Sequence, residues 1–272
     1  MKNIFITGTS SGLGKAAVKL FHSNGWKVIA TMRDTSKAKD FEGMERVTVL
    51  PLDISNNEQI NTTVNSAIAL GNIDVVLNNA AYGAIGALES LTEEEILKIV
   101  DTNLLGAIRI TKAFVPHYRQ KKSGLFINIT SMAGFLTFPF DSLYHAVKFG
   151  LEGWSEGMSY ELEQFGIRIK TVAPGFIKTA FGSNMVVTAS EPYQPLMDVY
   201  LKAVSNPDMM KDGSTPEAIA DVVYEAATDG KDQVHYIAGN DAQALYERRL
   251  KIGAEAYRKE ISNQFLTQTN NM

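Results

Sequence analysis

Hydrophobic and polar positions alternate along the chain in short blocks. Seven short runs rich in Val, Ile, Leu and Phe are separated by longer segments whose apolar residues recur with a helical period. Because continuous apolar runs are typical of strands that helices cover on both faces, these runs predict a parallel sheet. We expect strands at Asn3–Thr7, Lys27–Thr31, Val47–Leu50, Ile73–Leu77, Leu125–Thr130, Arg168–Val172 and Val234–Ala238.

The segments between the strands carry helix signals. Thr92 precedes three glutamates and Thr215 precedes Pro216, and both threonines suit a helix N-cap. Repeated alternation of strand and helix predicts an α/β fold: a single doubly wound Rossmann domain over residues 1–272, with a parallel seven-stranded sheet and helices on both faces. We expect helices at Leu13–Ser23, Asn57–Leu70, Glu93–Lys121, Ser142–Phe165 and Pro216–Asp229.

Two segments break this rhythm. The segment at about 181–214 is long and contains three prolines, which predicts a loop over the substrate site. The segment at about 241–265 is polar and amphipathic, which predicts a helical extension after the last strand.

Composition narrows the range of functions. The chain has 272 residues, 45% hydrophobic and 21% charged, with a net charge of −4, and no basic stripe indicates nucleic-acid binding. It has no cysteine, and its four histidines show no metal-ligand spacing, so we expect no metal. No apolar run reaches the ~20 residues that cross a membrane, and the start lacks the pattern of a secretory signal. We therefore expect a cytoplasmic protein that binds neither nucleic acid nor membrane.

A glycine cluster follows the first predicted strand. Gly8, Gly12 and Gly14 have the spacing Gly-x-x-x-Gly-x-Gly, and the next residues begin a helix pattern. Glycine permits a tight turn and lets a pyrophosphate approach backbone N–H groups at the helix N-terminus, so the cluster predicts a dinucleotide site. We expect its contacts from Gly8, Ser10, Ser11, Gly12, Leu13 and Gly14.

The end of the second strand bears on the choice of cofactor. Asp34 lies 20 residues after Gly14. At about this distance from the glycines, an acidic residue binds the ribose 2′-hydroxyl of NAD. Arg33 comes first after the strand, however, and its planar guanidinium suits a 2′-phosphate. We therefore expect NADP(H) rather than NAD(H), with Asp34 orienting Arg33 or capping a turn. Asp53, after the third strand, is a candidate for the adenine end, or a turn-forming residue.

Candidate chemistry lies in the second half of the chain. Tyr144 and Lys148 are four residues apart, hence on one helix face, and Ser131 follows a predicted strand at the edge where open α/β sheets bind ligands. Tyr118 and Lys122 repeat the spacing without other chemical residues nearby, so we interpret them as a solvated face. At Tyr144, an adjacent lysine ammonium is expected to lower the phenol pKa, and a shift of about three units corresponds to roughly 4 kcal/mol.

The chain resembles the short-chain dehydrogenase/reductase family over about residues 1–229, most closely its hydroxysteroid and retinol dehydrogenase-like branch. The matching motifs are Thr7-Gly8-x-x-x-Gly12-x-Gly14, Asn78-Asn79-Ala80, Asn103, Ser131, Tyr144-x-x-x-Lys148 and Pro174-Gly175. The resemblance implies Tyr144 as general acid/base, Ser131 polarising the carbonyl, Lys148 binding the nicotinamide ribose and Asn103 holding a water in the proton relay. The remaining cofactor contacts that it implies are Asn79, Pro174, Gly175, Ile177 and Thr179.

The sequence also departs from the family pattern. Ala81 stands where the family has glycine, which puts the local backbone in question because alanine disfavours positive φ. The resemblance implies a homodimer or homotetramer, but the C-terminal extension is longer and more charged than usual. Asn103 could also be a mid-helix residue bonded to a neighbouring carbonyl.

Apolar residues flank the predicted site. With no lysine or arginine among them, they favour a small, neutral, hydrophobic ketone, aldehyde or alcohol, and so an NADPH-dependent carbonyl reductase acting on C=O or CH-OH groups. Two alternatives remain: an NAD-linked alcohol dehydrogenase that oxidises a hydrophobic secondary alcohol, and a non-catalytic NADP-sensing protein. The expected substrate contacts are Tyr82, Ser131, Phe135, Phe138, Phe181 and Met185.

Overall fold

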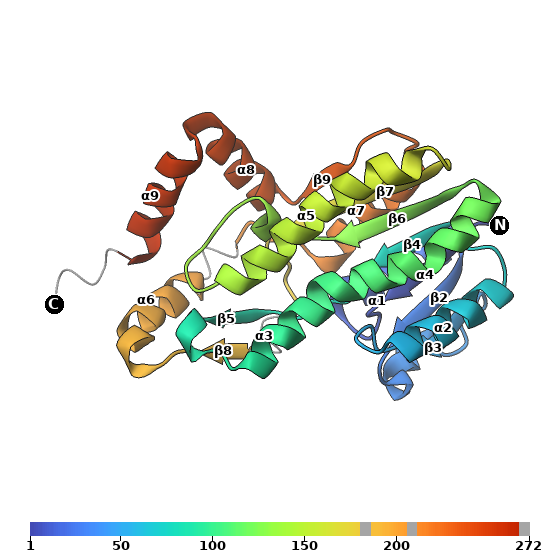
Figure 1. Ribbon diagram of the computed structural model, residues 1–272, viewed down its shortest axis with the longest axis horizontal. Helices are drawn as coiled ribbons and strands as arrows, with labels where there is room; N and C mark the ends of the chain where they lie inside the picture. Colours follow the sequence, from blue (N-terminus) through green and yellow to red (C-terminus); the bar gives the residue numbers. More distant parts are fainter. Residues whose placement is uncertain (180–185, 206–210, 267–272) are drawn as a thin grey trace.

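A seven-stranded, fully parallel sheet forms the centre of the computed structural model, which describes residues 1–179, 186–205 and 211–266 (Figure 1). The strand order is β3-β2-β1-β4-β6-β7-β9, so the chain changes direction between β1 and β4. In open α/β sheets such a switch point opens a crevice at the carboxyl ends of the strands. The strands are β1 Asn3–Thr7, β2 Lys27–Met32, β3 Val47–Pro51, β4 Val75–Asn78, β6 Gly124–Ile129, β7 Ile167–Pro174 and β9 His235–Ala238.

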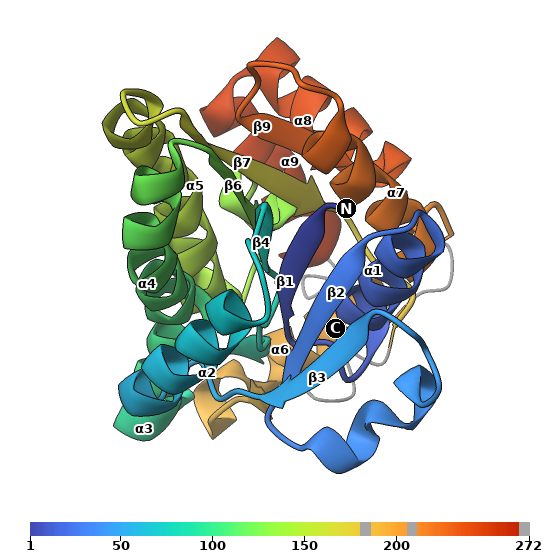
Figure 2. The same ribbon diagram turned by 90° about the vertical axis from the view of Figure 1, so that its right-hand side faces the viewer.

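Helices cover both faces of this sheet (Figure 2). One buried cluster joins α1 and α7 to side chains such as Ile4 and Val28, and the cluster on the other face joins α2, α4 and α5 to Phe5 and Ile29. Successive strand residues thus feed opposite cores, as the uniformly apolar runs predict. The helices on these faces are α1 Gly12–Ser23, α2 Asn57–Ala69, α4 Gly106–Lys121, α5 Ser142–Glu163 and α7 Pro216–Thr228.

Two predicted helices are interrupted. The expected helix Glu93–Lys121 consists of α3 (Glu93–Val100), a π-helical turn (Asp101–Leu105) and α4. The C-terminal extension consists of α8 (Asn240–Ile252) and α9 (Ala254–Leu266), because Gly253 adopts a φ of +84° and ends α8. The Thr92 cap is confirmed, since Thr92 and Glu95 form a reciprocal capping box.

Part of the expected 181–214 loop has regular structure. Its described residues include β8 (Val186–Thr188), which pairs in parallel with β5 (Ala84–Gly86), and the helix α6 (Gln194–Val204). α6 packs against α9, and together they lie at the end of the sheet toward which the strands point (Figure 1). The short 3₁₀ segments are Thr35–Phe41, Leu88–Ser90, Met132–Gly134 and Glu191–Tyr193.

No helix in the described part of the chain has the length and apolar character that spanning a membrane requires.

Candidate active site

A cleft of about 1760 Å³ lies at the carboxyl ends of β1, β4, β6 and β7. It brings together residues that are far apart in the sequence, including every expected cofactor contact and three of the four residues expected to be catalytic. The expected residues that line it are Gly8, Ser10, Ser11, Gly12, Leu13, Gly14, Arg33, Asp53, Tyr82, Asn79, Ser131, Phe138, Tyr144, Lys148, Pro174, Gly175, Ile177 and Thr179.

The glycine loop packs closely against the neighbouring backbone, with no side chain in between. Gly8 has a φ of +71°, and a Cβ added there would lie 2.8 Å from Ala80 Cα. A Cβ on Gly14 would lie 2.2 Å from the Gly8 carbonyl oxygen, so no side chain fits between loop and helix. Asn79 fixes the loop by donating from Nδ2 to the carbonyl oxygens of Thr7 at 2.9 Å and Gly8 at 3.0 Å. The cradle therefore fits a dinucleotide pyrophosphate.

The start of α1 faces this loop with unused donors. Ser11 is the N-cap residue, yet its side chain makes no capping hydrogen bond within the described structure. The first N–H groups of a helix have no intrahelical partner, and the helix dipole is positive there. This end of α1 can therefore hold the phosphates of a dinucleotide.

Two basic side chains lie beyond the glycine loop, at the end of β2. Ser10, Arg33, Asp34 and Lys37 line a second cavity of about 340 Å³ beside the main cleft. Asp34 accepts hydrogen bonds from Ser36 N at 3.1 Å and Ser36 Oγ at 2.6 Å, and it caps the 3₁₀ segment. Arg33 is exposed and donates to no described residue, so it can turn toward a ligand. Lys37, which the sequence analysis missed, adds a second cation.

Asp53 lines the cleft near the expected adenine end. Its Oδ1 accepts from Ser55 N at 2.9 Å and from Ser55 Oγ at 2.7 Å, which is a local turn. Partial burial raises the pKa of Asp53, but the two hydrogen bonds from Ser55 and the positive charge of Arg33 together outweigh burial, and the net shift is downward. The carboxylate therefore stays charged and can accept a further hydrogen bond from a ligand.

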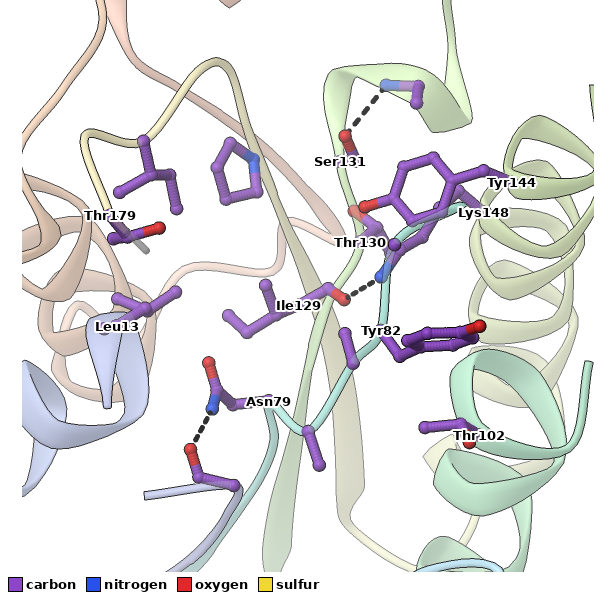
Figure 3. Close-up of a pocket in the computed structure, with 18 of the residues that line it drawn as sticks. Leu13, Asn79, Tyr82, Thr102, Ile129, Thr130, Ser131, Tyr144, Lys148 and Thr179 are labelled. Carbon is purple, nitrogen blue, oxygen red and sulfur yellow. Dashed lines mark hydrogen bonds between the residues drawn. The ribbon is translucent and has the colours of Figure 1, made fainter. Parts of the chain in front are cut away.

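Ser131 and Tyr144 meet at the opposite wall of the cleft (Figure 3). Ser131 follows β6, and its Oγ accepts a hydrogen bond from Ala133 N at 3.1 Å, which fixes the hydroxyl. Tyr144 lies in the first turn of α5, and its hydroxyl interacts with Ser131. Figure 3 shows the tyrosine oxygen directed into the cleft, with Leu13 and Thr179 on the far side.

Lys148 lies one helical turn beyond Tyr144 and is buried, with 1% of its surface exposed. Its Nζ donates to the carbonyl oxygen of Ile129 at 3.0 Å and lies 5.6 Å from the centroid of the Tyr144 ring. Burial lowers the pKa of Lys148 to about 8, although the nearby Glu152 carboxylate acts in the opposite direction. The ammonium is thus held beside the phenol ring by the end of β6.

The expected lowering of the Tyr144 pKa is wrong for the protein without cofactor. Burial raises the pKa of this phenol, Asp141 raises it further, and the hydrogen bond with Ser131 only partly offsets the two. Desolvation outweighs the lysine because Lys148 is itself buried and its charge is disfavoured. Tyr144 therefore holds its proton firmly, as a general acid must before it donates.

Asn103 does not line the cleft. Its side chain donates to the carbonyl oxygens of Tyr82 at 2.8 Å and Ile99 at 3.1 Å, and it accepts from Tyr82 N at 3.1 Å. The amide is therefore used to hold the Tyr82 backbone, as the structural alternative predicted. It lies in the π-helical turn, a distortion that leaves backbone groups differently paired from those of a regular helix.

The expected substrate contacts have different outcomes. Tyr82 and Phe138 line the cleft, whereas the prediction for Phe135 is wrong. Phe135 turns away because its ring packs edge-on against Tyr246, with centroids 5.3 Å apart, and against His235 at 5.8 Å. Phe181 and Met185 lie outside the described residues. Cleft-lining residues that the sequence analysis missed include Asp141, Tyr200, Leu201, Val204 and Phe265.

The arrangement matches known proteins. A family model described as short chain dehydrogenase matches residues 2–189. The chain belongs to the short-chain dehydrogenase family. An uncharacterized oxidoreductase from Schizosaccharomyces pombe is 36% identical over 211 residues, which cover 77% of this chain and 89% of the relative. Retinol dehydrogenase 8 from Bos taurus is 32% identical over 242 residues, covering 82% and 77% of the two chains.

A solved structure with a similar fold contains NADP. The structure of ElxO with NADP bound superposes with a TM-score of 0.76 and 28% identity, covering 89% of this chain and 99% of that one.

Ala81, which stands where the family has glycine, has no strained backbone. The non-glycine residues with positive φ in the described part of the chain are Arg46, Lys122 and Phe140. As a short-chain dehydrogenase, the protein is an oxidoreductase that acts on CH-OH or C=O groups.

Proposed function

We propose that this short-chain dehydrogenase is an NADPH-dependent carbonyl reductase for hydrophobic ketones or aldehydes. The observation that carries the proposal is a single cleft lined by Ser131, Tyr144 and Lys148 on one side and by the glycine loop on the other. A non-catalytic cofactor sensor would not need a proton donor, an oxygen-binding hydroxyl and a buried ammonium around one apolar space. The complete set therefore favours catalysis.

When bound, NADPH supplies the hydride for the carbonyl carbon. Negative charge then develops on the carbonyl oxygen, which the Ser131 hydroxyl stabilises by a hydrogen bond while the Tyr144 hydroxyl donates its proton. The raised pKa of Tyr144 keeps this proton available throughout the neutral range. Lys148 lines the same cleft and would bind the ribose hydroxyls, and its charge would stabilise the phenolate that remains.

The preference for NADP(H) rests on the end of β2. Arg33 and Lys37 border the small cavity beside Ser10, where they would pair with a 2′-phosphate. Asp34 caps the 3₁₀ segment through Oδ1, and the cations Arg33 and Lys37 beside it favour a phosphate over a ribose 2′-hydroxyl at this position. The NADP bound to ElxO supports the same choice.

The test is the rate of absorbance loss of NADPH and of NADH with a panel of aromatic ketones, aldehydes, steroids and retinal. Retinal belongs in the panel because of the bovine relative's name. We expect NADPH to be oxidised with a kcat/KM at least tenfold above that of NADH, and Arg33→Ala to reduce this ratio. Faster turnover with NADH would contradict the cofactor assignment, and no turnover with either cofactor would contradict the proposed activity.

A further inference from the structure

One carboxyl group in the cleft is only weakly bonded to the rest of the fold. Asp141 immediately precedes α5, three residues before Tyr144, but its side chain makes no capping hydrogen bond. The hydroxyl of Tyr200 donates to Asp141 Oδ2 over 3.4 Å, which is a long contact. Oδ1 is buried and has no hydrogen-bond partner within the described part of the chain. No described Lys, Arg or His lies within ion-pair distance of it.

Burying the Asp141 carboxyl group at this position lowers the stability of the fold. Buried polar atoms without partners are rare in folded proteins because each one loses its water without replacement. Burial raises the pKa of Asp141 to about 7, and its negative charge also raises the pKa of Tyr144. Asp141 thus works against the phenolate that proton transfer must leave behind. Residues that destabilise the fold in this way are concentrated at functional sites.

We infer that Asp141 binds a hydroxyl or ammonium group of the substrate, a few bonds away from the carbonyl that is reduced. This inference rests on the proposed function and narrows its substrate class to ketones with a polar donor near the reactive carbon. Residues three apart at a helix start lie on the same side, about 5–6 Å between Cβ atoms, so one small molecule reaches both Asp141 and Tyr144. The donor supplies the partner that Oδ1 lacks.

The wall around Asp141 indicates what the rest of the substrate is. Phe138, Leu201, Val204 and Phe265 line the same cleft, from the segment before α5 and from α6 and α9. Tyr200 of α6 also packs against Phe265 of α9, with ring centroids 5.7 Å apart. A polar group at Asp141 would therefore be followed by an apolar chain or ring that contacts these side chains. The substrate is an amphipathic ketone with its polar end at the catalytic tyrosine.

The experiment compares three matched substrates: a medium-chain aliphatic ketone, its α-hydroxy derivative and its α-amino derivative. With the wild-type protein and NADPH, we expect a kcat/KM at least about tenfold higher for a donor-bearing ketone than for the plain ketone. Asp141→Leu should remove this preference. Asp141→Asn separates the two donors, because an amide oxygen still accepts from a hydroxyl but has no charge to attract an ammonium. Asp198→Asn is the control, since Asp198 is exposed on α6 and bonded to Gln194.

A binding measurement separates this inference from the proposed function. Titration calorimetry of the NADP-loaded protein with the three ketones, which cannot react with the oxidised cofactor, should show tighter binding of the α-hydroxy or α-amino compound, and Asp141→Leu should abolish the difference. This holds even if no ketone is reduced, an outcome that would contradict the proposed activity alone. Equal binding and equal turnover of the three compounds by the wild-type protein would overturn the inference, as would an unchanged preference in Asp141→Leu.

Thermal unfolding provides a second readout. Because Oδ1 is buried without a partner, Asp141→Leu should raise the unfolding midpoint of the cofactor-free protein by about 2 °C or more. A structural role for Asp141 predicts the opposite sign. A fall in the midpoint would therefore contradict the inference.

Discussion

Tyr-x-x-x-Lys occurs twice in this chain, and the two copies lie in opposite environments. Tyr144 and Lys148 stand at the start of α5, beside the carboxyl ends of the strands, where the cleft opens. Tyr118 and Lys122 stand at the end of α4, beside the start of β6. The spacing is the same, so position relative to the sheet decides whether it carries chemistry.

The second copy is not the solvated face that the sequence predicted. Tyr118 is fully buried, and its ring occupies the space where Gly124 would carry a Cβ, 2.2 Å away. Within the described part of the chain its hydroxyl donates only to Leu125 O, over 3.4 Å, and burial raises the pKa of Tyr118 well above the usual value. Lys122 is exposed and adopts a left-handed φ of +53° at the end of the helix. The pair therefore closes the core and ends a helix.

The strongest contrast is expected in turnover. Tyr144→Phe removes the proton donor but keeps the ring, so kcat should fall by about 10²–10⁴-fold while NADPH still binds. Tyr118→Phe is the matched control, and its kcat should stay within about twofold of wild type. Steady-state rates together with NADPH fluorescence titrations measure both. Retained activity in Tyr144→Phe would remove this residue from the mechanism.

Stability should show the reverse order. Tyr118→Ala leaves a cavity among buried aromatic rings, including Phe114 and Phe126, and should lower the unfolding free energy by about 3–5 kcal/mol. Tyr144→Ala removes a side chain that borders an open cleft and should cost less. Urea denaturation of the two variants gives the comparison. Equal losses would mean that Tyr118 is not the core residue of the pair.

The two lysines should also differ. The pKa of Lys148 is about 8 in the folded protein, below its ordinary value of 10.5, so the unfolded chain binds more protons between these values. Charged, buried Lys148 therefore destabilises the protein near neutrality, and the cost is relieved as the pH rises from about 8 to 10.5. Lys148→Met should be inactive yet more stable at pH 7, by up to about 3 kcal/mol.

Lys122→Met serves as its control, and its stability should change by no more than about 0.5 kcal/mol. Urea denaturation at pH 7 and pH 10 measures the unfolding free energy of both variants. A Lys148→Met protein less stable than wild type at pH 7 would show that its bond to Ile129 O outweighs desolvation.

The smallest effect concerns the carboxylate one turn beyond Lys148. Buried Glu152 accepts from His235 Nδ1 at 2.8 Å, and this hydrogen bond raises the pKa of His235 above its ordinary value of 6.5. The pair's stabilisation is thus fully present below pH 6.5 and is lost as the pH rises through the higher, folded pKa. His235→Gln should be less stable than wild type at pH 6 by under about 1 kcal/mol, with the difference vanishing by pH 9. A difference that grows with pH would contradict this.

The sheet was predictable from the sequence because each strand is a continuous apolar run that both helical layers bury, as at Ile4–Ile6. The sequence analysis missed β5, β8 and α6. The strands β5 and β8 have only three residues each, and all three elements form where the chain packs over the cleft. The break at Gly253 was also missed, because a single glycine inside a helical pattern can either be tolerated or end the helix with a positive φ, as it does here. Periodicity does not report such tertiary choices.

The site divides in the same way. Residues expected to contact a cofactor through loop geometry, such as Gly8 and Asn79, carry motifs with fixed spacing, and the structure brings them to the cleft. Phe135 and Asp141 depend on side-chain direction: one ring turns toward Tyr246, while one carboxyl group lines the cleft. Direction at a helix start or in a short 3₁₀ segment has no sequence signature, so these two outcomes needed the structure.

The most direct test of a carbonyl held between Tyr144 and Ser131 is a crystal structure of the protein with NADP and a ketone that it reduces. We expect the ketone oxygen within about 2.6–3.2 Å of both Tyr144 Oη and Ser131 Oγ, with the nicotinamide ring beside Lys148. A ketone oxygen bound away from both hydroxyls, or a nicotinamide at the opposite end of the cleft, would contradict the proposed mechanism.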